Sequence, residues 1–166
     1  MTRNPRNLSE PVHFITDHNL GKLAKWLRLF GFDTLYHVGK TNRDIWNRAL
    51  AEKRIVLTRK KNLHYYNKDV ETILITTEDL ADQLGEVFKK LGQVVQEEHV
   101  LKICSDCNHL LQKVEKRAVA DRVPAYILET QEVFYLCGRC TRIYWRGSHV
   151  ERIEKILKRH SPMDRP

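Results

Sequence analysis

Four cysteines constrain the fold of this chain more than any other feature. They form two C-x-x-C pairs, Cys104 with Cys107 and Cys137 with Cys140, and 29 residues separate the pairs. A C-x-x-C on a tight turn directs two thiolates toward one point, and two such turns complete a tetrahedral site that Zn²⁺ fills well. Four sulfur ligands close the coordination sphere, so the predicted zinc is structural rather than catalytic. Two redox-active pairs are the alternative interpretation.

The residues before the cysteines alternate between strand-like and helix-like patterns. Residues 13–16, 34–38, 54–58 and 72–76 have strand character, and apolar residues recur at helical spacing between and after these strands. This alternation predicts βαβ units with right-handed crossovers, and therefore an α/β fold with a mainly parallel sheet. We expect an α/β domain over residues 12–96 and a zinc ribbon over 100–160. The ribbon should end in a C-terminal helix over 149–160, because Ser148 and Glu151 fit a capping box.

Composition indicates a globular protein with an affinity for polyanions. The chain is 42% hydrophobic and 30% charged, and its 29 basic and 21 acidic residues give a net charge of +8. A basic surface favours nucleic acid first and acidic membranes second, although a high isoelectric point can also be incidental. No stretch approaches transmembrane length and the N-terminus lacks the apolar core of a signal peptide. We therefore expect a cytoplasmic protein with no membrane partner.

Two aspartates are candidate metal ligands in the first domain. Asp17 follows the first predicted strand, and Asp44 lies in the first turn of the second predicted helix. Both can reach the carboxyl edge of a parallel sheet, where carboxylates bind Mg²⁺ or Mn²⁺ and the ion activates water for phosphodiester cleavage. The alternatives are simpler. Asp17 can cap the first helix, and Asp44 can be a favourable charge near a helix N-terminus.

Basic and aromatic residues supply candidate nucleic-acid contacts. Basic side chains neutralise phosphates, and aromatic rings stack on unpaired bases. For Trp145 we favour packing between the ribbon and the first domain. The candidate contacts are Lys22, Lys25 and Arg28 in the first helix, Arg59 and Lys61 after the third strand, and Arg142, Tyr144 and Arg146 beside the second cysteine pair.

The joined pattern resembles a known family. The segments FITDHNLGKLAKWLRLFGFDTLY, RDIWNRALAEKRIVLTRK, CSDCNHLL and CGRCTRIYWRGSHVERI are together similar to the Mut-seven C-terminal domain family, across residues 13–157. The resemblance implies a PIN-like three-layer α/β/α ribonuclease fold followed by a four-cysteine zinc ribbon. It also implies metal-dependent endoribonuclease activity on RNA, with Mg²⁺ or Mn²⁺ as the catalytic ion. Asp17 and Asp44 match the first two acidic positions of the family.

Lys60 departs from the family pattern. The family usually reads T-R-D after the third strand, whereas this chain reads Thr58-Arg59-Lys60. An ammonium repels a divalent ion at short range. Three alternatives follow: a degenerate site that binds RNA without cleaving it, one ion held by Asp17 and Asp44 with Asp33 or Asp69, or Lys60 as a direct phosphate ligand. If the site is active, Asp17, Asp44 and Lys60 are the candidate catalytic residues.

Two other functions compete with cleavage. One is a non-catalytic RNA-binding or ribonucleoprotein-associated protein on the same fold. The other is an adaptor that docks on a protein partner through the ribbon.

Overall fold

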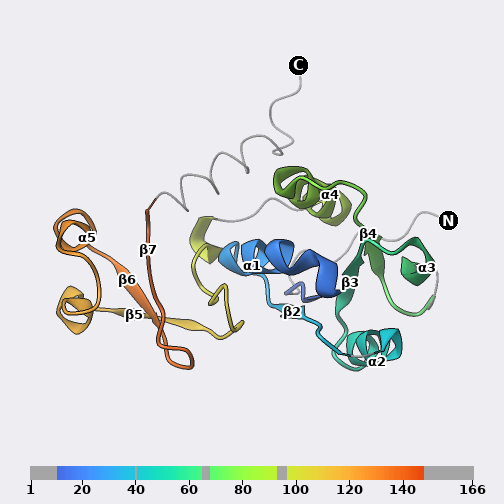
Figure 1. The fold of residues 1–166 in the computed structure, drawn as a ribbon, viewed down its shortest axis with the longest axis horizontal. Helices are drawn as coiled ribbons and strands as arrows, with labels where there is room; N and C mark the ends of the chain where they lie inside the picture. The colour runs from blue at the N-terminus through green and yellow to red at the C-terminus, as the bar shows by residue number, and fades with distance from the viewer. Residues whose placement is uncertain (1–10, 40, 65–67, 93–96, 148–166) are drawn as a thin grey trace, which may run out of the picture.

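A parallel sheet of four strands organises the first part of the chain. The computed structural model describes residues 11–39, 41–64, 68–92 and 97–147. The strand order is β2-β1-β3-β4, and every neighbouring pair is parallel, as the sequence predicts (Figure 1). The strands are β1 (Phe14–Thr16), β2 (Thr34–Tyr36), β3 (Ile55–Thr58) and β4 (Thr72–Leu74).

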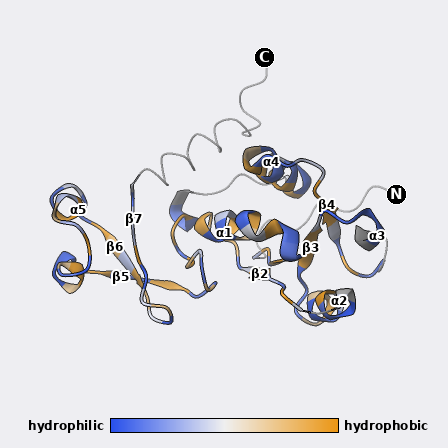
Figure 2. Cartoon of the chain, in the orientation of Figure 1, coloured by the Kyte–Doolittle hydropathy of each residue, from blue (hydrophilic) through white to orange (hydrophobic). Residues whose placement is uncertain are grey.

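Helices cover both faces of this sheet, which makes the fold a three-layer α/β/α arrangement. Phe14 packs into the core shared with α1 (Gly21–Leu29) and α4 (Leu80–Leu91). The next residue, Ile15, points to the opposite face and packs into the core shared with α2 (Asn42–Ala51), where Trp46 is buried. Successive strand residues alternate between faces, so one short apolar strand serves both cores. Both α1 and α4 carry apolar and polar segments side by side (Figure 2).

Local capping sets the ends of the helices. Asp79 caps α4 by accepting the backbone N–H of Ala81, and Gly92 ends it in the left-handed region with a φ of 62°. Gly31, with a φ of 88°, ends the segment after α1, and a Cβ there would collide with the His99 carbonyl. The short helix α3 (Lys61–His64) was not expected, because the residues after β3 read as a polar loop.

The ribbon is a separate antiparallel sheet of three strands in the order β5-β6-β7. A small core of Val119, Ile127 and Phe134 stabilises it. The predicted helix over 149–160 lies outside the described residues. The elements of the ribbon and its approach are η2 (Glu97–His99), β5 (Leu111–Val114), η3 (Lys116–Val119), α5 (Ala125–Thr130), β6 (Phe134–Cys137) and β7 (Ile143–Trp145).

The approach to the ribbon packs against the first sheet's core. Val100 and Leu101 are buried in the cluster that α1 and α4 form, and the Leu101 N–H donates to the Leu29 carbonyl at 2.9 Å. The predicted domain boundary between residues 96 and 100 therefore stays a prediction. Val100 and Leu101 belong to the predicted ribbon, yet they complete the core of the α/β part. No helix in the described ranges is both long and apolar enough to cross a membrane.

A partly buried ion pair joins β2, β3 and the ribbon at the amino edge of the sheet. Arg54 donates to both Asp33 oxygens, at 2.9 and 3.0 Å, and Asn108 donates to Asp33 Oδ1 at 2.5 Å. Burial raises the pKa of Asp33, but the hydrogen bonds from Arg54 and Asn108 outweigh it and hold the pKa below its usual value.

We expect Asp33→Asn to lower the free energy of unfolding at pH 7 by about 1.5–3 kcal/mol, because a charge-assisted pair is lost. The lowered folded-state pKa means that this stabilisation is present above the ordinary carboxyl pKa. It is lost as pH falls through the folded value. Urea unfolding between pH 7 and pH 3 should show the variant and wild type converging in acid. Glu129→Gln, on the exposed face of α5, is the control and should leave the pH profile unchanged. A constant gap between Asp33→Asn and wild type at every pH would contradict this interpretation.

Candidate functional site: a cysteine cluster and an acidic sheet edge

The four cysteine sulfurs converge on one point. Their Sγ atoms all lie within 4.8 Å of one another, and within the described ranges no other His, Cys, Asp or Glu residues form such a group of three or more. Cys104 Sγ lies 3.5 Å from Cys140 Sγ, and Cys107 Sγ lies 3.4 Å from Cys137 Sγ. Four sulfurs around one zinc are about 3.8 Å apart, given a Zn–S distance of about 2.3 Å. The four cysteines therefore cluster as the sequence predicts, and the cluster is a possible metal site whose sulfur ligands suit Zn²⁺.

A tyrosine completes the surroundings of the sulfurs. Tyr144 packs against the main core, and its hydroxyl lies 3.1 Å from Cys104 Sγ. Burial raises the pKa of Cys104, but hydrogen bonds from Tyr144 and from the amides of Cys107 and Asp106 outweigh it and lower the pKa to about 6. The lowered pKa of Cys104 favours its thiolate, the form that binds metal, whereas burial raises the pKa of Cys107 and of Cys140.

Arg28 fastens this cysteine loop to the first sheet. The residue is 5% exposed, and its Nη1 donates to the carbonyls of Ser105 and Asp106 at 2.9 and 2.8 Å. Its Nε donates to the Thr34 carbonyl at 2.7 Å. One buried guanidinium therefore holds the first C-x-x-C turn against the start of β2.

Basic side chains surround the same loop. Asp106 pairs with Lys25 at 2.9 Å and with Arg142 at 2.7 Å, and the Cys104 and Cys107 sulfurs are among the groups that interact with Arg28. A zinc ion with four thiolates carries a net charge of −2. Cations around the cluster compensate that charge, so these side chains have a structural reason to lie where they do.

The opposite edge of the sheet holds Asp17. This residue directly follows β1 and is only 4% exposed. Its Oδ2 accepts the Thr58 hydroxyl at 2.6 Å, and its Oδ1 accepts the Asn19 N–H at 2.9 Å, which caps the 3₁₀ turn η1 (His18–Leu20). Asp17 therefore caps the 3₁₀ turn that leads into the first helix, whereas the N-cap of α1 itself is Leu20. These hydrogen bonds fix the carboxylate and still leave lone pairs on both oxygens.

Asp44 lies in the first turn of α2, beside a histidine that was not predicted from the sequence. Asp44 Oδ2 accepts the Thr41 hydroxyl at 2.8 Å. A Cβ built on Gly39 would lie 3.4 Å from Asp44 Oδ2 and against the His37 ring, so both side chains border the same glycine. His37 Nε2 is buried and has no hydrogen-bond partner among the described residues. Its position directly after β2 is the signal that could have identified it, because Asp17 holds the same position after β1.

Lys60 lies at this edge but does not neutralise it. Its backbone N–H donates to Thr58 Oγ1 at 3.1 Å, so Thr58 links Lys60 to Asp17. Its side chain is half-buried, and its ammonium forms no ion pair with Asp17, Asp44 or any other carboxylate in the described ranges.

Comparison with protein families identifies this combination. The family model described as Mut7-C RNAse domain matches residues 12–157, which include both the acidic edge and the cysteine cluster. The chain belongs to the Mut7-C RNAse domain family. Neither the curated proteins nor the solved structures contain a match. Membership confirms the resemblance and places the chain in a ribonuclease-like family. Whether this chain can cleave RNA has to be argued from its own site residues.

Asp17 and Asp44 are the carboxylates that could hold a divalent ion at the acidic edge of this Mut7-C RNAse domain. Mg²⁺ is commonly bound through one or two carboxylates, with water and substrate phosphate as the other ligands. Asp17 and Asp44 supply two carboxylates. Beside Asp44, His37 Nε2 is buried and lacks a hydrogen-bond partner among the described residues, so a polar ligand could occupy that position.

Two suggested additional ligands, Asp33 and Asp69, are wrong. Asp33 directly precedes β2 and Asp69 precedes β4, so both lie at the amino edge of a parallel sheet. Asp17 follows β1 and lies at the carboxyl edge. Asp33 is also committed to Arg54 and Asn108.

The predicted RNA contacts separate into two groups at opposite ends of α1. This helix starts at the carboxyl edge and ends at the amino edge, where Arg28 meets β2 and the ribbon (Figure 1). Lys22, Arg59, Lys60 and Lys61 belong to the acidic edge, although Arg59 pairs with Glu78 at 3.0 Å. The ribbon group comprises Lys25, Arg28, Arg142, Tyr144 and Arg146.

Several members of the ribbon group have structural roles. Arg28 is buried, Lys25 and Arg142 pair with Asp106, and Tyr144 meets Cys104. Trp145 packs with Phe134 in the ribbon's own core rather than between the two parts, so the expected interface position is wrong.

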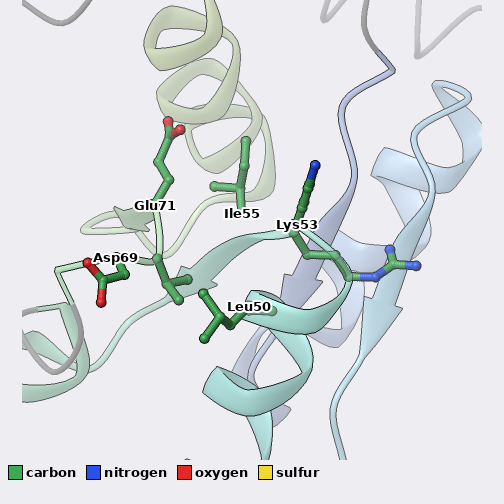
Figure 3. Close-up of a pocket in the computed structure, with 8 residues that line it drawn as sticks. Leu50, Lys53, Ile55, Asp69 and Glu71 are labelled. Atoms are coloured by element: carbon green, nitrogen blue, oxygen red, sulfur yellow. The ribbon is translucent and has the colours of Figure 1, made fainter.

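A pocket of about 220 Å³ lies at the amino edge, between the end of α2 and the approach to β4 (Figure 3). Lys53 and Arg54 line it from one side, and Asp69 and Glu71 from the other. Arg54 is engaged by Asp33 and Glu52, and the pocket is remote in the fold from Asp17. It does not contribute to the acidic edge.

Zinc removal should disrupt more than the ribbon. We expect the purified protein to contain one zinc, and a strong chelator to abolish ribbon structure and loosen α1, because Arg28 loses the carbonyls that the metal holds in place. Elemental analysis and hydrogen exchange of the α1 amides measure the two effects.

Arg28→Met should release zinc faster to a chromophoric chelator and lower the free energy of unfolding by about 2–4 kcal/mol, because one buried and two partly buried hydrogen bonds to carbonyls are lost. Arg43→Met, on the exposed face of α2, is the matched control. Equal zinc release from both variants would contradict the coupling.

Proposed function

We propose that this Mut7-C RNAse domain is a metal-dependent endoribonuclease whose divalent ion is held by Asp17 and Asp44. The observation that carries the proposal is Asp17, a buried carboxylate fixed by Thr58 and Asn19 and opposed by no ion-pairing cation in the described ranges. Burying a charge is costly unless it is hydrogen-bonded. A buried, positioned carboxylate at the carboxyl edge of a parallel sheet is what a metal-binding role requires.

Asp17, Asp44 and Lys60 have different roles at this edge. Asp17 is already oriented by two hydrogen bonds, whereas Asp44 would exchange its contact with Thr41 for the ion. The Lys60 ammonium is unpaired within the described ranges, so it can bind an RNA phosphate and offset its charge. When bound, Mg²⁺ or Mn²⁺ would activate water and stabilise the charge that develops on the phosphate.

A second function, RNA binding without cleavage, is favoured by Lys60 itself. A cation at the third acidic position repels a divalent ion and attracts phosphate. The acidic edge also brings no three potential ligands together as closely as the cysteines, within the described ranges. The proposal also includes a protein or ribonucleoprotein partner at the ribbon and a cytoplasmic location.

Cleavage of labelled single-stranded and structured RNA in Mg²⁺ or Mn²⁺ separates the two functions. We expect wild type to cleave and Asp17→Asn to lose roughly 100-fold or more in rate, since a metal ligand is removed. Asp82→Asn, on the exposed face of α4, is the control and should cleave like wild type. Cleavage that appears only after Lys60→Asp would leave non-catalytic RNA binding as the function of the natural chain.

The salt dependence of RNA affinity tests the role of the cations. Each phosphate contact contributes about 0.7 to the slope of log affinity against log salt for a single strand. We expect Lys60→Ala and Lys22→Ala each to reduce the slope by about that amount, and Lys113→Ala, on β5, to leave it unchanged. Fluorescence anisotropy over a salt series measures the slopes. Negligible salt dependence in wild type would favour a protein adaptor instead.

A further inference from the structure

An exposed aromatic ring stands at the acidic edge and has no role so far. Tyr36 is the last residue of β2, and it is 40% exposed. In the β1–β2 register it lies opposite Thr16, the residue directly before Asp17. The exposed ring therefore stands at the end of the strand that pairs with β1, and its register partner Thr16 directly precedes the candidate metal ligand.

The ring is held rigidly. Its hydroxyl donates to the His18 carbonyl at 2.9 Å. The ring also lies over Gly21, the first residue of α1, where a Cβ would sit 3.3 Å from Cε2. An aromatic face that is fixed before binding loses little conformational entropy when a ligand covers it.

One turn anchors both the ring and the carboxylate. Asp17 caps η1 through the Asn19 N–H, and Tyr36 holds the same turn through the His18 carbonyl. The spacing between ring and carboxylate is thus set by a single short segment. A ligand that contacts both groups would meet them at a spacing that is fixed before it binds.

Two lysines lie on the elements next to the ring. Lys22 directly follows Gly21 and is exposed, and Lys60 extends from the end of β3, on the other side of β1. A flat apolar face beside phosphate-binding cations matches one unpaired nucleotide, with its base on the ring and its phosphates on the lysines. A duplex hides its base faces and cannot make this contact.

We infer that Tyr36 is a stacking platform for one unpaired base of an RNA strand at the acidic edge, and that it makes the site prefer single-stranded RNA. The inference rests on the RNA-binding part of the proposed function and does not require cleavage. If the ring only stabilised η1, its loss would alter stability without any preference among RNA positions or strand states.

The test uses the full zinc-loaded chain with Asp17→Asn as background, without added Mg²⁺ or Mn²⁺, so that RNA stays intact. Single-stranded oligonucleotides carry 2-aminopurine at successive positions. We expect its fluorescence to be quenched at one position and the quenching to disappear in Tyr36→Ala. Affinity for the single strand should fall about 5- to 150-fold, the range for loss of one stacked base, while duplex affinity and the salt slope stay unchanged.

Two variants make the outcome decisive. Tyr36→Phe keeps the ring but loses the hydroxyl, so it should retain the quenching and most of the affinity. Tyr126→Ala removes a 64% exposed tyrosine from α5 in the ribbon and should behave like the background. The inference is overturned if Tyr36→Ala binds like the background, if Tyr36→Phe is as weak as Tyr36→Ala, or if single strand and duplex lose equally. If Tyr36→Ala still binds RNA, the proposed function is unaffected. If neither the background protein nor any variant binds RNA, both the proposed function and the stacking inference are wrong.

Discussion

Arg28 makes the contact on which the relation between the two parts of this protein depends. Its guanidinium is buried at the end of α1, and its hydrogen bonds reach β2 and two carbonyls of the first C-x-x-C turn. No carboxylate accepts these bonds. The charge is tolerated because carbonyl dipoles and the cysteine cluster surround it, so the α/β part and the metal site stabilise each other.

This contact gives the molecule two chemically different ends. The zinc-binding loop lies at the amino edge of the parallel sheet, and the acidic residues lie at the carboxyl edge, with α1 running between them. The ribbon's cations compensate the cysteine cluster, which makes most of them poor candidates for holding RNA at Asp17. The carboxyl edge instead has its own cations and its own aromatic ring, so the proposed chemistry is local to the α/β part.

Much of this could be predicted from sequence, where local pattern decides the outcome. Alternation of apolar strands with amphipathic helices fixed the parallel sheet, and the C-x-x-C spacing fixed the metal cluster. The short helices α3 and α5 were missed because segments of four to six residues carry no measurable helical period. Asp33 and Asp69 were suggested because they are acidic, without regard to which end of a strand each flanks.

The sequence by itself determined the class of fold, the family, the four metal-binding sulfurs and the departure at Lys60, because each follows from residue type and spacing along the chain. The tertiary structure decided the rest. It buried Arg28 between β2 and the first C-x-x-C turn, and it packed Trp145 into the core of the ribbon. It also placed Tyr36 and His37 at the carboxyl edge, where Asp17 lies. Those outcomes depend on contacts between residues distant in sequence, and a charged or aromatic side chain on a helix or strand looks the same in sequence whether it meets solvent, a carbonyl or a substrate.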